Sequence, residues 1–146
     1  VAYLLEIPVS GYALSAWEAF RQGQSAQGGV RFDDQKLAAQ LQRGIISDQL
    51  VDRYCTVWMA GIAAEDLVYG NAEGGAEDRA KITTILTQLK RPGESKLKQS
   101  WASLQARSLL ENHQSAYEAL AKAMTERASI SDCYQAIQQH LSVHQN

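Results

Sequence analysis

The segment Tyr54-Cys-Thr-Val-Trp-Met-Ala-Gly-Ile-Ala-Ala-Glu-Asp-Leu-Val-Tyr-Gly70 predicts a long helix that is central to the fold. Apolar and small residues recur at helical spacing from Leu50 to Val68, which places them on one side of a helix. Ser47 is a suitable N-cap residue, and Gly70 suits the C-terminal end. The small residues around Gly61 would let a second helix approach closely.

The sequence on both sides predicts more helices and a small β ribbon. Val9 to Ala16 and Gly28 to Phe32 mix β-branched, aromatic and small residues on either side of the turn-forming stretch Gln22 to Gln27. Helical spacing is found at 34–44, 76–90, 94–113 and 116–127, and again in a last helix capped by Ser129 or Ser131. Val1 to Glu6 is expected to be the end of a helix that stops before Pro8.

These elements predict a mainly α fold with about five to six helices and a small β hairpin or ribbon near the N-terminus. At 146 residues the chain suits a single domain over 1–146. The helix over 76–90 is expected to bury a stripe of Ile82, Ile85, Leu86 and Leu89. The helix over 94–113 is expected to bury Leu97, Trp101, Leu104, Ser108 and Leu109.

Composition excludes several classes of function. The formal net charge is -2 and the charges are interspersed, so no basic stripe predicts binding to nucleic acid. No Gly-x-x-x-x-Gly-Lys-Ser/Thr pattern occurs, so no nucleotide site is predicted. No apolar run reaches the ~20 residues that cross a bilayer. The two cysteines, Cys55 and Cys133, are too few for a disulfide framework and are expected to be reduced.

The long helix and the residues after it resemble the protease domain of FtsH-type zinc metalloproteases. In that family a helix with the pattern Gly-x-Ala-Ala-Glu-x-Leu-x-Phe/Tyr-Gly leads through a Gly-rich turn to an Asp that completes the zinc site. Here the corresponding residues are Gly61 to Gly70, then Gly74 to Asp78, and Thr83. Among family members the chain looks most similar to the stand-alone FtsH-like metalloproteases of cyanobacteria and chloroplasts, which lack the ATPase.

The resemblance implies a zinc peptidase domain that is N-terminally incomplete in these 146 residues. The His-Glu-x-x-His helix, which carries two ligands and the catalytic Glu in that family, does not occur in the sequence. Val1 to Pro8 is similar to the segment that comes directly after that helix in the family, so the motif is expected immediately before Val1. This chain by itself is therefore expected to be inactive, with no catalytic residue of its own. The longer protein would hydrolyse peptide bonds with a zinc-activated water.

Asp78 is the candidate zinc ligand, chosen over Glu77 because of its spacing to Thr83. The segment from Gly70 to Asp78 is one residue shorter than the family's usual spacing, and Glu77 replaces the family's Asn. The other interpretation is that Asp78 is a carboxylate in the first turn of a helix, where the helix dipole favours negative charge.

Other polar residues are weaker candidates for a functional role. Glu65 matches the Glu of the family's Ala-Ala-Glu, where the resemblance implies a supporting role, and a surface ion pair is the alternative. His140 and His144 have the spacing of a zinc-binding pair, but Leu141 stands where a peptidase needs its Glu. His113 is expected at an exposed helix end.

A hypothesis of a different class is a catalytically inactive FtsH-like scaffold or interaction domain. Its expected partners are a membrane protein or a second copy of the chain, whereas the peptidase hypothesis predicts a protein or peptide substrate. Cytoplasmic surroundings, or the stroma of a plastid, fit either hypothesis.

Overall fold

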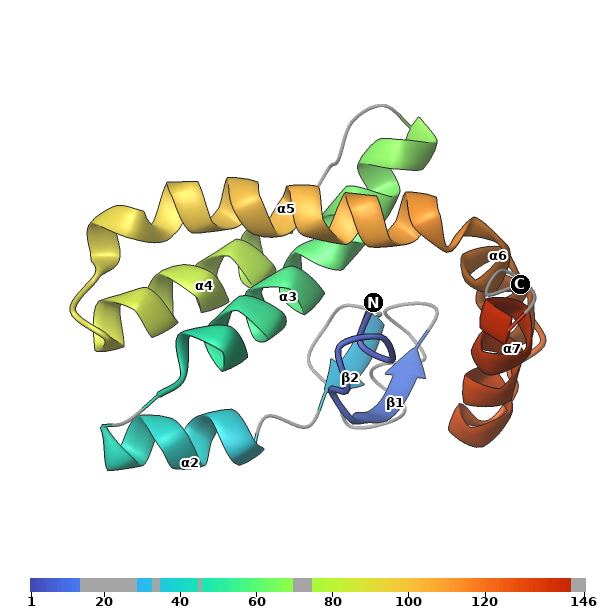
Figure 1. Ribbon diagram of the computed structural model, residues 1–146, viewed down its shortest axis with the longest axis horizontal. Helices are drawn as coiled ribbons and strands as arrows, with labels where there is room; N and C mark the ends of the chain where they lie inside the picture. The colour runs from blue at the N-terminus through green and yellow to red at the C-terminus, as the bar shows by residue number, and fades with distance from the viewer. Residues whose placement is uncertain (14–28, 33–34, 45, 70–74, 143–146) are drawn as a thin grey trace. The chain divides into compact units, whose positions relative to one another are not determined.

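The computed structural model describes residues 1–13, 29–32, 35–44, 46–69 and 75–142, and the described part is mainly helical, as predicted (Figure 1). It contains six α-helices, a short 3-10 helix and two strands. The helices are α2 (Gln35–Arg43), α3 (Asp48–Tyr69), α4 (Ala76–Gln88), α5 (Ser95–Asn112), α6 (Gln114–Thr125) and α7 (Ile130–Ser142), with the 3-10 helix η1 (Pro92–Glu94) between α4 and α5. None of the described helices combines the length and the apolarity needed to cross a membrane.

The chain divides into two compact units. The first unit comprises Val1–Leu5 and Asp34–Asn112, and thus α2 to α5. The second unit comprises Glu6–Asp33 and His113–Asn146, and thus the strands, α6 and α7.

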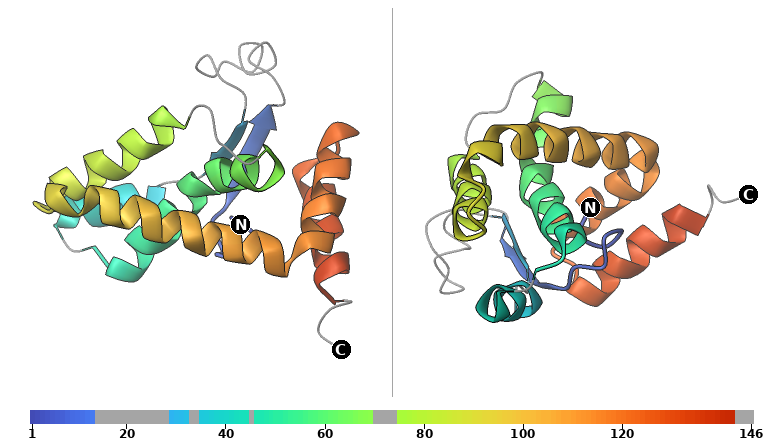
Figure 2. Two further views of the ribbon diagram at one scale, coloured as in Figure 1. Left: turned by 90° about the horizontal axis from the view of Figure 1, so that it is seen from above. Right: turned by 60° about the vertical axis from the view of Figure 1, so that its left-hand side comes forward.

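Helix α3 is the core of the first unit. It packs most extensively against α5 and also against α4, as Figures 1 and 2 show. The six consecutive residues 54–59 are all buried, which a helix with only one covered face cannot achieve. The one-sided pattern predicted from the sequence is therefore wrong for this stretch. Gly61, expected at a close helix contact, is exposed and would have open space around a Cβ.

Helix α4 buries the predicted stripe. Ile82 and Leu86 are completely buried, and Ile85 is 5% exposed, whereas Leu89 at the end of the stripe is half-buried. Complete burial of one such side chain stabilises a fold by about 1.5–3 kcal/mol. These residues therefore anchor α4 in the first unit.

Helix α5 is rotated relative to the prediction. Its buried residues are Ser95, Ala102 and Ala106, whereas Leu97 is 75% exposed and Leu104 is 66% exposed. Trp101, between them on the same face, is 38% exposed. The distance between two packed helices depends on the size of the side chains at their contact. Small side chains on the inward face therefore allow α5 to lie close to its neighbour. The apolar face predicted as core, Leu97, Trp101 and Leu104, therefore lies largely in solvent.

Helix ends follow the predicted capping residues closely. The Ser47 hydroxyl accepts a hydrogen bond from the Leu50 amide at 3.2 Å, and the Ser129 hydroxyl accepts one from the Asp132 amide at 3.0 Å. These contacts satisfy amides that the first turn of a helix leaves unpaired. Ser129 is thus the cap of the last helix. Val1–Glu6 differs from the prediction, because it forms one turn closed by Leu5 N–H to Val1 O at 3.1 Å rather than a helix end.

The second unit contains the ribbon and a helix pair. Strands β1 (Val9–Ala13) and β2 (Gly29–Phe32) are antiparallel, with Val9 opposite Phe32, and the register is irregular between Val9 and Gly11. The predicted turn between the strands lies outside the described residues. Helices α6 and α7 pack against each other, and the Val9 amide donates to the Tyr134 hydroxyl of α7 at 3.2 Å.

Candidate functional site

Asp78 lies in the first turn of α4, next to Glu77. Its side chain is 37% exposed, and one carboxylate oxygen is 3.6 Å from the Lys81 ammonium, one turn further along the helix. This ion pair is long and open to water, so it contributes little stability.

Burial raises the pKa of Asp78 above its ordinary value. Lys81 acts in the opposite direction, and the neighbouring Glu77 adds a smaller effect that raises the pKa further. Loss of water around the carboxylate thus outweighs the attraction of the lysine. Carboxylates with a shifted pKa are frequent at functional sites, although structural ion-pair networks also shift pKa values.

Gly75 fixes the place where α4 begins. It has φ of +82°, and its carbonyl accepts the Arg79 amide at 3.0 Å, so it opens the helix without a side-chain cap. A Cβ on this residue would collide with the side chain of Ile62 on α3. Glycine is therefore required for its left-handed conformation and for the close approach to α3. The first turn of α4, with Asp78, is held against the core helix by this contact.

Thr83, which the sequence analysis used to select Asp78, has a structural role. Its hydroxyl lies 2.8 Å from the Ser95 hydroxyl at the start of α5 and 3.3 Å from the Arg79 carbonyl. The Gln99 amide donates to the same Ser95 oxygen at 2.9 Å. These bonds satisfy the buried Ser95 and connect α4 to α5. Thr83 and Asp78 are five residues apart, so they lie on different faces of the helix.

The other residues singled out from the sequence add no ligand to Asp78 in the described part of the chain. Gly70, Gly74 and His144 lie outside the described residues, and Glu65 belongs to α3 but its side chain is not described. Within the described ranges, no group of three or more His, Cys, Asp or Glu side chains is arranged to hold a metal ion.

The two described histidines lie on α7 and just before α6. His140 is exposed on α7, and its Nδ1 lies 2.8 Å from the Ala136 carbonyl one turn earlier. His113 precedes α6 and is half-buried rather than exposed as expected. Its Nδ1 is buried and has no hydrogen-bond partner among the described residues.

Sequence reasoning missed a set of charged contacts that join α3 to α5 and to the residues around η1. The Lys98 ammonium lies 2.6 Å from the Asp52 carboxylate and 5.1 Å from the centre of the Trp101 ring. Arg91 contacts Asp48 at 3.1 Å and also Glu94. The contact of Asp52 with Lys98 spans 46 residues, and that of Asp48 with Arg91 spans 43. Helical spacing could therefore not have revealed them.

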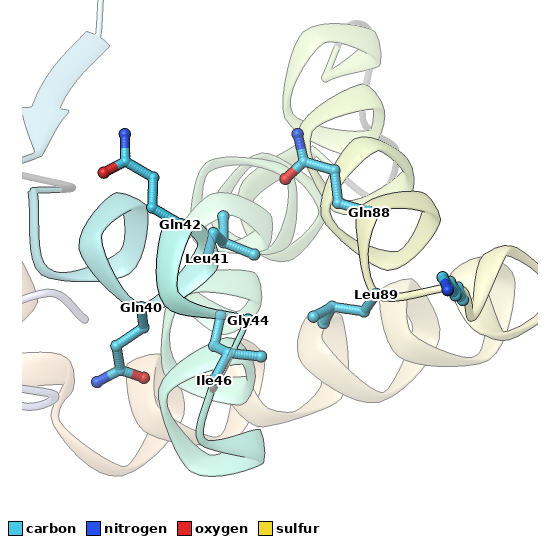
Figure 3. Close-up of a pocket in the computed structure, with 8 residues that line it drawn as sticks. Gln40, Leu41, Gln42, Gly44, Ile46, Gln88 and Leu89 are labelled. Carbon is cyan, nitrogen blue, oxygen red and sulfur yellow. The ribbon is translucent and has the colours of Figure 1, made fainter.

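A pocket of about 620 Å³ lies between the C-terminal ends of α2 and α4. Leu41, Ile46 and Leu89 converge at its floor, and Gln42 and Gln88 project to the same side of it (Figure 3). The remaining lining residues are Gln40, Gly44 and Lys90. No feature of the sequence pointed to this pocket, because its two halves are separated by more than 40 residues.

Comparison with known proteins gives no relative of this chain: no family model matches it, no curated protein matches its sequence, and no solved structure matches its fold.

Proposed function

We propose that this chain is part of a zinc-dependent metallopeptidase of the FtsH type, with Asp78 as its ligand to the metal. The proposal is based on the sequence pattern of Gly61 to Gly70, followed by Gly75 and Asp78. One structural observation supports it: Asp78 is a half-buried carboxylate whose ion pair among the described residues is a long one to Lys81, at the start of a helix whose position Gly75 fixes.

The fit of a zinc ion can be judged from the donors that the described residues offer. Asp78 provides one oxygen donor of a kind that zinc accepts. Zinc needs at least two more protein ligands, and the described residues do not supply them around Asp78. We therefore assign the remaining ligands to a His-Glu-x-x-His segment outside these 146 residues, and we assign no catalytic step to this chain.

Within this proposal, the chain's own residues hold one ligand in place. Gly75 against Ile62 sets the start of α4, and the buried Ile82 and Leu86 hold the rest of α4 in the core. Asp78, together with two imidazoles from outside these residues, would hold the zinc, and the bound metal would supply a water of lowered pKa as the nucleophile for peptide hydrolysis.

The test uses the longer protein with its natural sequence before Val1. A His-Glu-x-x-His segment within a few residues upstream of Val1 is expected. In that protein Asp78→Ala should lower both the zinc content, measured by mass spectrometry of the metal, and the rate of peptide cleavage. Glu77→Ala, on the same helical turn, is the matched control and should retain both. Unchanged zinc content and activity in Asp78→Ala would reject the assignment of Asp78.

The second candidate function is an inactive FtsH-like interaction domain that associates with a second copy of itself. The observation that favours it is the exposed apolar face of α5, on which Leu97 and Leu104 are more than half exposed and Trp101 lies between them. Light scattering should then show a dimer that Leu97→Gln with Leu104→Gln converts to a monomer. A wild-type chain that is monomeric at high concentration, together with zinc in the longer protein, would favour the peptidase instead.

A further inference from the structure

Helix α5 carries a row of apolar side chains that face solvent. Leu97 and Leu104 are more than half exposed, and Trp101 between them is 38% exposed. At 3.6 residues per turn, the three side chains fall within about 60° of one another around the helix axis. Their spacing of four and then three residues is that of the anchor residues through which a helix packs on a partner.

The Trp101 ring is restrained before any partner binds. The Lys98 ammonium lies 5.1 Å from the centre of this ring and 2.6 Å from the Asp52 carboxylate of α3. A cation over the face of an aromatic ring attracts it. An interface formed on a restrained side chain loses less conformational entropy than one that must order a free side chain. Trp101 is therefore suited to be an anchor residue.

The charges beside the apolar row make this face complementary to itself. Lys96 and Glu111 are both exposed and lie on the same flank of the row. They are separated by about 60° around the helix axis and by about 22 Å along it. Within the described part of the chain Lys96 forms no ion pair, and the Glu111 carboxylate, which contacts Arg107, is 54% exposed. One end of the flank thus has a cation and the other end a carboxylate.

A two-fold axis brings these two ends together. The axis that relates two antiparallel helices is perpendicular to their common plane, so each flank meets the same flank of the second copy in reverse order. When Lys96 of each copy lies opposite Glu111 of the other, the axis passes between residues 103 and 104. Leu104 then lies next to its own counterpart and close to Trp101 of the second copy. The charges and the apolar row therefore select the same register.

We propose that two copies of this chain associate through α5 in an antiparallel arrangement, with Leu104 next to the two-fold axis and with Lys96 of each copy paired with Glu111 of the other. This inference rests on the second candidate function, self-association through α5, and adds the arrangement of the two copies. The row is short compared with the roughly 20–30 residues that each partner contributes to a standard interface, so the dimer should be weak.

The same charges favour a second copy over a lipid surface. Helices that lie on anionic membranes are rich in lysine and arginine on their polar side. Here the flank of the row carries both signs, and the whole chain has a formal net charge of -2. A surface with both signs is attracted to its own inverted copy, whereas an anionic membrane gains little from it.

The first test is disulfide formation, under mild oxidation at millimolar concentration, between variants with one added cysteine on α5. Leu104→Cys should form a covalent dimer, because the two copies of residue 104 are adjacent. Leu97→Cys is the matched control on the same face. Its two copies should be about 20 Å apart along the helices, whereas a disulfide spans about 4.4–6.8 Å between Cα atoms. The native Cys55 and Cys133 are buried and should form no cross-link.

The second test exchanges the two charges, with the dimer dissociation constant measured by analytical ultracentrifugation. Lys96→Glu and Glu111→Lys should each raise this constant at least threefold, and the variant that carries both should return to within twofold of the wild type. The two residues are about 22 Å apart within one helix, so this recovery requires contact between copies. Lys36→Glu, at an exposed lysine of α2, is the control and should leave the constant unchanged.

The results separate this inference from the candidate function on which it rests. A chain that stays monomeric at millimolar concentration rejects both, and its binding to phosphatidylglycerol vesicles would then assign the apolar row to a lipid surface. A dimer in which Leu97→Cys cross-links as fast as Leu104→Cys rejects the antiparallel arrangement alone. A dimer that the double charge exchange leaves as weak as the single variants rejects the pairing of Lys96 with Glu111, while self-association stands.

Discussion

Gly75 at the start of α4 lies directly against Ile62 of α3, so closely that a Cβ on residue 75 would overlap the Ile62 side chain. Gly75→Ala should therefore lower the free energy of unfolding by about 2–4 kcal/mol. About 1–2 kcal/mol of this comes from the positive φ and the rest from overpacking against Ile62. Urea denaturation followed by circular dichroism measures the loss.

Two other glycines separate these two causes. Gly44 has φ of +69° but open space around a Cβ, so Gly44→Ala should cost only the backbone term, about 1–2 kcal/mol. Gly93 has neither a positive φ nor a close neighbour, so Gly93→Ala should change stability by less than about 0.5 kcal/mol. Equal effects for Gly75→Ala and Gly44→Ala would show that Ile62 yields without cost.

The helices and their caps were predictable because the signals are local. Ser47 and Ser129 cap helices through contacts three residues away. The buried face of α5 was not predictable in the same way. Leu97, Trp101 and Leu104 have the spacing of a core stripe, but Ala102 and Ala106 are the residues that are buried. Their small side chains allow α3 to pack close to α5. Which face of α5 is buried thus depends on the surface of α3, which is distant in sequence.

On α5 the large apolar residues are exposed and the alanines are buried. Substitution of the large residues should therefore affect stability less than substitution of the alanines. Leu97→Gln and Leu104→Gln should each change the free energy of unfolding by less than about 0.5 kcal/mol, because both side chains are largely in solvent. Ala102→Leu and Ala106→Leu should each cost about 1–3 kcal/mol or more, since both alanines are completely buried. Thermal or urea unfolding compares the four variants. A loss above about 2 kcal/mol for Leu97→Gln would place that side chain in the core instead.

Of the candidate site, the sequence predicted the position of one residue, Asp78. The sequence placed Asp78 in the first turn of a helix, and the structure agrees. The burial that raises its pKa, and the contact of Gly75 with Ile62, depend on the packing of α4 against α3. Asp78 was chosen for its spacing to Thr83, yet the Thr83 hydroxyl pairs with Ser95, twelve residues further along the chain. The long-range polar contacts of α3 with η1 and α5 could be recognised only after the helices were assembled.

The raised pKa of Asp78 predicts a pH-dependent cost to stability. Between its pKa in the unfolded chain and the higher pKa in the folded state, the folded state holds more protons, so stability falls as pH rises through this window. Asp78→Asn removes this loss. Its stability relative to the wild type should therefore be higher at pH 7 than at pH 3, as measured by urea unfolding at both values.

Glu77→Gln is the control for this experiment. Glu77 is exposed in the same helical turn, where the helix dipole favours a negative charge. At pH 7 this variant should lose stability slightly rather than gain it. A gain for both variants would indicate general repulsion between the two carboxylates, not burial of Asp78.

The ion pair of Lys98 with Asp52 should be stronger than the surface pairs of this protein. Its side chains are 20% and 32% exposed, whereas Arg107 and Glu111 on α5 are 46% and 54% exposed. A double-mutant cycle with Lys98→Met and Asp52→Asn should give a coupling energy of about 1 kcal/mol. The same cycle for Arg107 and Glu111 should give about 0.3–0.5 kcal/mol. Equal values would mean that the partial burial of Lys98 and Asp52 has no energetic effect.

The buried thiol of Cys55 should make the protein lose stability in alkali. Burial raises the pKa of Cys55 to about 12; the nearby Lys98 lowers it and Asp52 raises it to smaller extents. An unfolded thiol ionises near pH 9, whereas the folded one stays neutral, so this group's contribution to stability is lost as pH rises from about 9 toward 12. The variant Cys55→Ala has no thiol at this position, so it should not show this loss of stability in alkali.

The comparison of wild type with Cys55→Ala isolates this effect. At pH 8 the variant should be less stable because the substitution leaves a small cavity in a completely buried site. The difference should shrink as pH rises to 10.5, because only the wild type bears the cost of keeping the thiol neutral. Native Cys55 should also resist iodoacetamide, which reacts with thiolates, until the chain unfolds. A constant difference between pH 8 and pH 10.5 together with rapid alkylation of the native protein would show that Cys55 reaches water and ionises normally.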